Sequence, residues 1–180
     1  MVYSFKLLNE LFLSKYFIIT QNPKPKTQNP KKMNHSTVNN QIILFAVMFT
    51  VAIFLNPMNI LAYDYSHLFF STTLVLSAAY MASTMLWSHQ VVHYLQMGHF
   101  NRKIFTIGVI LSLLFIVLLR SQFIVSPKQW LRRMIPHHST ALTTTKRLLA
   151  NSTVDDKTYR LAKNIILSQE KEIDFMKTLL

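Results

Sequence analysis

The sequence predicts an all-α protein in which three transmembrane helices are followed by a C-terminal helical hairpin. Three apolar runs, at residues 42–62, 68–87 and 104–119, approach the roughly 20 residues that cross a bilayer. Beyond residue 126, apolar residues recur at spacings of three and four, which is the period of an amphipathic helix. The chain has 180 residues with no Cys and two Gly, which excludes disulfides, thiolate catalysis and a glycine-rich phosphate loop.

Residues 1–41 form a predicted basic, Pro-rich N-terminal extension. The stretch Thr20-Gln-Asn-Pro-Lys-Pro-Lys26 is echoed by Thr27-Gln-Asn-Pro-Lys31, a composition typical of an extended, solvated linker. The apolar, aromatic stretch before it lacks a small-residue cleavage site, so it fits an interfacial helix better than a signal peptide. Met33 is an alternative start of the chain.

Residues 42–122 form the predicted three-span membrane region. The formal charge of +12 comes from Lys and Arg outside residues 33–101, which contain none. This distribution indicates charge flanking membrane spans and not a nucleic-acid surface. Six basic residues lie on the N-terminal side of the predicted membrane: Lys24, Lys26, Lys31, Lys32, Arg102 and Lys103. Four lie on the hairpin side: Arg120, Lys128, Arg132 and Arg133. We therefore expect the hairpin outside the cytoplasm. A start at Met33 would reverse the count.

Residues 123–180 form the predicted hairpin. Ser126, Pro127 and Gln129 resemble a helix N-cap, N1 and N3, and residues 151–155 supply a loop and a second cap. Two neighbouring stripes follow on the first helix: Trp130, Met134, His137, Ala141, Thr144 and Leu148, and then Leu131, Ile135, His138, Leu142 and Leu149. The second helix offers a seam of Ala162, Ile165, Gln169, Glu172, Met176 and Leu179. We expect His137 and Thr144 to pair with the polar seam residues. So short a hairpin cannot bury a large core alone, so we expect it to form a homodimer or to dock on its own membrane spans.

The stretch Met134-Ile-Pro-His-His-Ser139 carries the main candidate site. Imidazole suits copper, zinc, iron and nickel, and a thioether favours Cu(I). We expect Pro136 to interrupt the helix, with the two His in the first turn after it. Metal-ligand candidates are His137, His138, Met134, Met176 and Glu172, with copper as the ion.

A structural role for the histidines and a pH response through histidine protonation stay open beside this interpretation, whereas the enzymatic alternatives are rejected. The histidines could be structural, with one bonded to Glu172 and the other in solvent, because adjacent helical residues project about 100° apart. A Ser139–His138–Asp155 triad lacks a nucleophile elbow, and a di-iron site lacks its Glu-x-x-His motifs, so no enzyme is expected. Met81, Met85, His89, His93 and Met97 recur every four residues, and here packing is favoured over a second metal site.

Met134-Ile-Pro-His-His138, Gln169, Glu172-Ile173 and Met176 together resemble the family catalogued as domain of unknown function 305. The resemblance covers roughly residues 56–180 and is closest to a small membrane-anchored branch. It implies a ferritin-like fold, and copper binding as in some soluble members. Those members carry a methionine six residues after the second His, where this chain has Thr144. The expected function is binding or buffering of a soft metal, and the alternative is a non-catalytic oligomerisation module.

Overall fold

The computed structural model describes residues 33–151 and 153–180, and over these residues the regular structure is helical. The elements are α2 (Met33–Phe54), α3 (Pro57–Ile60), the 3-10 turn η1 (Tyr65–His67), α4 (Thr72–Met97), α5 (Arg102–Ser121), α6 (Pro127–Asn151) and α7 (Asp156–Thr178). The predicted all-α class is confirmed. The Pro- and Lys-rich repeat and the interfacial helix lie outside the described residues, and α2 begins inside the predicted extension.

The apolar helices begin and end where local signals direct them. The Ser71 hydroxyl accepts a hydrogen bond from the Leu74 N–H (3.2 Å) and caps α4. Gly98 then ends α4 in the left-handed region at φ 68°, which glycine adopts without a Cβ penalty. The Asn101 side chain caps α5 in the same way at the Ile104 N–H (3.3 Å). The helix at the second predicted span, residues 68–87, starts at Thr72 and runs to Met97.

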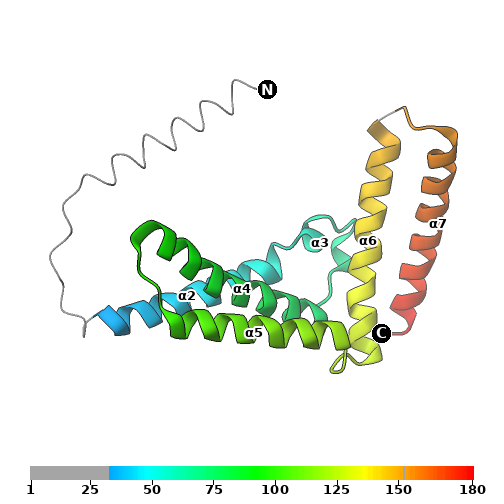
Figure 1. The fold of residues 1–180 in the computed structure, drawn as a ribbon. Helices are drawn as coiled ribbons and strands as arrows, with labels where there is room; N and C mark the ends of the chain where they lie inside the picture. The colour runs from blue at the N-terminus through cyan, green and yellow to red at the C-terminus, as the bar shows by residue number, and fades with distance from the viewer. Residues whose placement is uncertain (1–32, 152) are drawn as a thin grey trace, which may run out of the picture. The chain divides into compact units, whose positions relative to one another are not determined.

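Helices α4 and α5 form an antiparallel pair, shown in green in Figure 1. Gly108 lies so close to α4 that a Cβ there would come within 3.0 Å of the Trp87 backbone nitrogen, so the two backbones touch at this point. Helix α2 packs on α4 through Ala52, Ile53 and Ala78.

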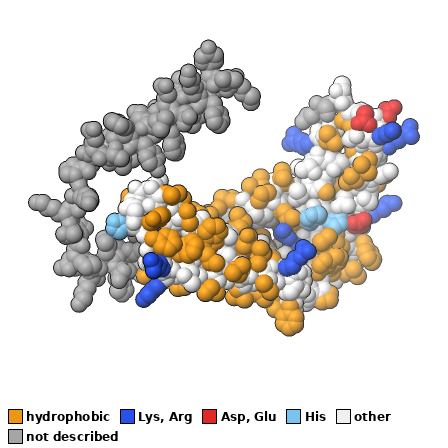
Figure 2. All heavy atoms as spheres, in the orientation of Figure 1, with side chains coloured by type: hydrophobic (Ala, Val, Ile, Leu, Met, Phe, Trp, Pro, Cys, Tyr) orange, Lys and Arg blue, Asp and Glu red, His pale blue; other side chains and the backbone are white. Residues whose placement is uncertain are grey.

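Two helical stretches, Val38–Ile60 and Arg102–Ser121, are long and apolar enough to cross a membrane. Their most apolar windows are only 17% and 11% buried, so most of the apolar surface of both stretches is exposed. Helix α4 does not meet the same test, because Ser, Thr, Gln and His interrupt its apolar residues. Figure 2 shows hydrophobic side chains over much of the visible surface of these helices, whereas acidic side chains lie on the hairpin.

Helices α6 and α7 form a second antiparallel pair, the predicted hairpin. The Ser126 hydroxyl accepts from the Gln129 N–H (3.4 Å) with Pro127 as the first helical residue, and Asp155 caps α7 at the Lys157 and Thr158 N–H groups. Both predicted starts are confirmed. The predicted interruption at Pro136 is wrong, because α6 continues through it to Asn151. The missing N–H of this proline leaves one helical hydrogen bond unmade, and tertiary packing around buried Pro136 outweighs that cost.

The hairpin core consists of Leu131, Ile135, Leu142, Ile173 and Met176. Phe69, from the segment before α4, packs against it, together with Met134, Ile166 and Leu180. The hairpin therefore completes its core with residues 61–71 of its own chain. Phe69 lies before α4, so docking of the hairpin on the membrane spans and the dimer both stay predictions.

Candidate functional site

The segment between α3 and α4 is fastened to the middle of α6 at Ser139. The Tyr63 N–H donates to the Ser139 hydroxyl (2.8 Å), and the same hydroxyl lies 2.9 Å from Nδ1 of His67. Because the Ser139 oxygen accepts from Tyr63, its own proton is free to donate to His67. Ser139 is fully buried and His67 nearly so. The hydroxyl has one proton and two lone pairs, so it can donate to Nδ1 of a neutral His67 or accept from an Nδ1–H.

Burial of His67 lowers the pKa of its imidazole, and the nearby Lys177 ammonium lowers it further. Asp64 and Asp174 act in the opposite direction but do not offset these two effects. The local environment therefore favours the neutral imidazole, whose Nδ1 can accept the Ser139 proton.

Charged side chains strengthen the attachment from both hairpin helices. Lys146 of α6 lies 2.8 Å from the Glu170 carboxylate of α7 and 3.9 Å from the centre of the Tyr63 ring. The hydrogen bond from Lys146 to Glu170 raises the pKa of this lysine. The Gln129 side chain accepts a hydrogen bond from the Thr72 N–H (2.9 Å). It therefore bonds to the first residue of α4 and does not form a capping box on α6.

His138 lies at the seam of α6 and α7 with both ring nitrogens engaged. Nδ1 is 2.8 Å from the Met134 carbonyl oxygen, and Nε2 is 2.7 Å from a carboxylate oxygen of Glu172. A carbonyl only accepts, so Nδ1 carries a proton. Nε2 either donates to the ionised carboxylate or accepts from the protonated one. In both cases neither nitrogen of His138 has a lone pair free for a metal ion in this geometry.

His137 is exposed and separated from these contacts. Its ring centre is 5.9 Å from that of His138, and the rings are inclined by 66°. This follows from the 100° rotation between adjacent helical residues. The adjacent pair therefore does not present two imidazoles to one point.

The other candidate ligands divide between the core and the surface. Met176 is buried in the hairpin core and Met134 packs against it, whereas the Glu172 side chain is 53% exposed. Thr144 is exposed and its hydroxyl bonds to the carbonyls of its own helix. Within residues 33–151 and 153–180, no group of three or more His, Cys, Asp or Glu side chains is close enough to hold a metal ion.

The prediction of which stripe of α6 faces α7 was wrong in part. The stripe containing Trp130, His137 and Thr144 is largely exposed, and its neighbour with Leu131, Ile135 and Leu142 is buried. Glu172 therefore pairs with His138 and not with His137. Both stripes contain apolar residues 100° apart, so periodicity alone does not choose between them.

Sequence reasoning missed Tyr63 and His67, and it assigned no role in packing to Ser139. Asp64 two residues before Ser66 is a turn signal, and the structure contains that hydrogen bond at 2.7 Å. Nothing in the sequence links this turn to a serine 72 residues further along the chain.

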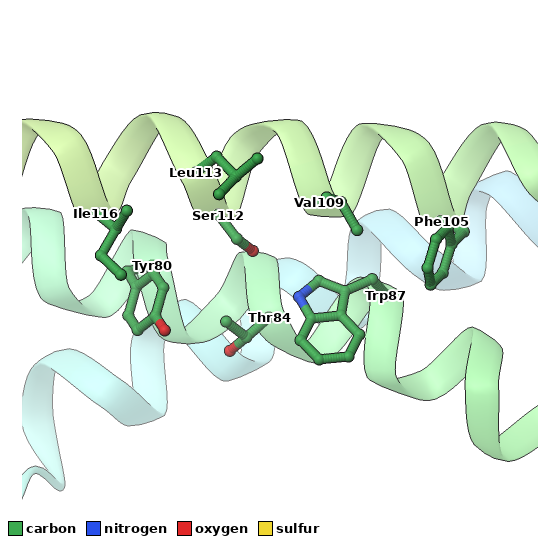
Figure 3. A pocket seen from close by; sticks show the side chains of 8 residues that line it. All are labelled: Tyr80, Thr84, Trp87, Phe105, Val109, Ser112, Leu113 and Ile116. Atoms are coloured by element: carbon green, nitrogen blue, oxygen red, sulfur yellow. The ribbon is translucent and has the colours of Figure 1, made fainter.

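A shallow groove of about 280 Å³ lies between α4 and α5, as Figure 3 shows. Its lining is mostly apolar and consists of Tyr80, Thr84, Trp87, Phe105, Val109, Ser112, Leu113 and Ile116. The hydroxyls of Thr84 and Ser112 already donate to carbonyls of their own helices. The groove therefore presents little polar chemistry to a ligand.

The fold and its contacts define a class: an α-helical protein with apolar helices and a C-terminal helical hairpin docked on the segment between two of them. The chain belongs to the family described as Domain of unknown function (DUF305), which matches residues 124–180, the hairpin itself. It is also 33% identical over 147 residues to an uncharacterized protein of Acanthamoeba polyphaga mimivirus, covering 79% of this chain and 92% of the viral protein. That likeness is longer than the hairpin, so it extends into the apolar helices. No solved structure matches the chain.

Proposed function

We propose that this protein is a membrane-anchored, non-catalytic interaction module. Helices α2, α4 and α5 cross the bilayer, and the α6–α7 hairpin stands on one side of it. Two observations support the anchor: the apolar stretches of α2–α3 and α5 are long enough to cross, and most of their side chains are exposed. In water such a surface would be costly, because exposed apolar area costs about 25 cal/mol per Å².

The attachment at Ser139 supports three crossings. Tyr63 and His67 precede α4, and Ser139 follows α5, yet they are in contact. The segment before α4 and the hairpin after α5 therefore lie on the same side of the membrane. If α5 crosses once, the chain must return through a second crossing, and α4 is the helix between them.

Internal hydrogen bonds support the crossing of α4 despite its polar residues. The hydroxyls of Ser77, Ser83 and Ser88 donate to backbone carbonyls three or four residues earlier. Such bonds satisfy hydroxyl groups without water, as a helix in a bilayer requires. With 26 residues, α4 reaches about 39 Å at 1.5 Å per residue, longer than the hydrocarbon core. The count of six basic residues against four supports a hairpin on the non-cytoplasmic side.

The geometry of His138 supports a structural role for the histidine motif. Both ring nitrogens are used in joining α6 to itself and to α7. The partner is a second copy of the chain: α7 exposes Leu161, Phe175 and Leu179 on its outer surface, and two hairpins would complete a ferritin-like bundle of four helices.

Copper binding is the second candidate function. Met134, Met176, His138 and Glu172 gather near one seam, so sulfur and nitrogen donors occur in one region. A ligand role for His138 would require it to release Glu172 or the Met134 carbonyl. Copper binding at this seam therefore requires the hairpin to rearrange around His138.

Topology can be tested directly because the chain has no Cys. Single cysteines at the exposed positions Tyr65→Cys, Lys171→Cys and Gln96→Cys would be labelled in sealed vesicles with a membrane-impermeant maleimide. The proposal predicts that positions 65 and 171 react from one side and position 96 only from the other. Reaction of all three from the same side would exclude the crossing of α4.

The role of the histidines is tested by a Cu(I) titration and by light scattering of the protein in detergent. For the interaction module, His138→Ala weakens the dimer and leaves copper uptake unchanged, with His137→Ala as the adjacent, exposed control. Loss of saturable copper uptake in His138→Ala with an intact dimer would establish copper binding instead. A monomeric wild-type protein would exclude the assembly role.

A further inference from the structure

Three histidines gather at the end of α4 far from the hairpin motif. His89 and His93 are four residues apart on the helix, and their ring centres are 6.2 Å apart. Gly98 turns the chain back in the left-handed conformation, so that His99 comes within 6.4 Å of His93 by the same measure. A helical spacing of four places both α4 side chains on one face.

Hydrogen bonds fix which nitrogen of His93 is free. Its Nδ1–H donates to the backbone carbonyl of His99 (3.0 Å). A carbonyl cannot donate, so in the neutral ring Nε2 keeps a lone pair. An Nδ1–H bonded to a backbone carbonyl is the arrangement that orients metal-binding histidines.

Gln41 of α2 contacts Nδ1 of His89. The Gln41 amide nitrogen lies 3.3 Å from Nδ1 of His89, while its amide oxygen is buried without a hydrogen-bond partner. In this orientation the amide donates to Nδ1, and the neutral ring carries its proton on Nε2. A 180° rotation of the amide exchanges its oxygen and nitrogen, so that Nδ1–H donates to the oxygen instead. That rotation leaves Nε2 of His89 as a second free donor atom.

We propose that His89 and His93 bind a divalent transition-metal ion through their Nε2 atoms. Neutral imidazole selects Zn(II), Cu(II) and Ni(II) over Mg(II) and Ca(II), which need oxygen ligands. The sequence has no Asp or Glu between residues 65 and 154 to supply such ligands nearby. Across the described part of the chain no three such side chains are close enough to share an ion, so two imidazoles hold the metal and water completes its coordination. His99 acts as a positioning residue through its backbone carbonyl.

This backbone role provides a matched control. His99→Ala removes an imidazole of the same cluster but retains the carbonyl that orients His93. The ligand variants His89→Ala and His93→Ala and the control His99→Ala therefore each remove one imidazole from the same cluster. Gln41→Leu removes the support of His89 and should lower metal affinity by about 10- to 100-fold, as loss of such supporting groups generally does.

The test uses Cu(II) as the probe and the full chain in detergent, with His137→Ala and His138→Ala as the background so that the hairpin motif contributes nothing. Calorimetry should give one saturable Cu(II) site, and pulsed electron paramagnetic resonance should show coupling to two imidazole nitrogens. His89→Ala and His93→Ala should each lower the affinity at least tenfold, while His99→Ala stays within twofold of the background. Circular dichroism of each variant checks that the helices are retained.

The site is refuted if the background protein shows no saturable binding, or if His93→Ala binds Cu(II) as the background does. Equal losses in His99→Ala and His93→Ala would refute the pair and the positioning role of His99. All these readouts come from a background without the hairpin histidines, so they are independent of the proposed interaction module.

Discussion

The two histidine pairs of this chain, His137–His138 in α6 and His89–His93 in α4, have opposite geometries. The adjacent pair is split, with one ring exposed and the other bonded at both nitrogens. The spaced pair shares a helix face; Nδ1 of His93 donates to a backbone carbonyl, which leaves its Nε2 free, and Nδ1 of His89 lies 3.3 Å from the Gln41 amide nitrogen. Adjacent histidines are conspicuous in a sequence, but a spacing of four is what brings two rings to one side of a helix. The spacing of the two histidines along the helix therefore decides which pair can chelate a metal ion.

The largest effect we expect comes from the buried contacts beside the adjacent pair. Ser139→Ala leaves the buried Nδ1 of His67 without its donor, which should lower the free energy of unfolding by about 1–3 kcal/mol. Ser168→Ala is the matched control, because Ser168 is exposed on α7 and bonds only to its own helix; its effect should stay within about 0.5 kcal/mol. Chemical unfolding with hydrogen exchange at residues 61–72 measures both. Equal effects would show that the attachment does not stabilise the hairpin.

A second, smaller effect is a pH dependence of stability that we expect near His67 and not at the His89–His93 pair. Burial lowers the pKa of His67 in the folded protein, so the unfolded chain binds a proton more readily. Stability is therefore full above the ordinary histidine pKa of about 6.5 and falls as the pH drops below it, until the pH passes the lowered pKa of the folded state. Intrinsic amide exchange slows as the pH falls, so the comparison uses protection factors, which are corrected for this change. The protection factors of residues 61–72 should be lower at pH 5.5 than at pH 7.5.

The control for this pH effect is His67→Gln, which keeps an acceptor for Ser139 but does not titrate. It should flatten the dependence, whereas His93→Ala at the other end of α4 should leave it unchanged. A dependence that persists in His67→Gln would assign it to another group.

Local features of the fold could be predicted from the sequence because they depend on neighbours. Ser126, Pro127 and Asp155 set the helix starts through bonds within four residues. Pro136 misled the same reasoning, since a proline inside a helix costs about 3 kcal/mol and packing around it outweighs that cost. Local preference is a weak guide wherever a residue is buried.

The sequence indicated some residues of the α6–α7 seam, but it indicated neither Tyr63 and His67 nor the contacts that they make. Met134, His138, Glu172 and Met176 do lie near one seam. The attachment of Tyr63 and His67 to Ser139 joins residues more than 70 positions apart, and no pattern in one sequence encodes such a pairing. The orientation of each imidazole depends on these distant partners, so the free nitrogens could be identified only in the structure.

The smallest effect we expect is from the ion pair at the adjacent histidines. Glu172→Gln removes the charge but keeps an oxygen that can accept from Nε2 of His138. Because the Glu172 side chain is 53% exposed, water and salt screen the pair, and the loss should be about 0.2–1 kcal/mol. The difference should vanish near 1 M salt, where screening reaches about 3 Å. Thermal unfolding at two salt concentrations measures it. A loss above about 2 kcal/mol that salt does not reduce would mean that the carboxylate is desolvated in the assembled protein, as a second hairpin packed over α7 would make it.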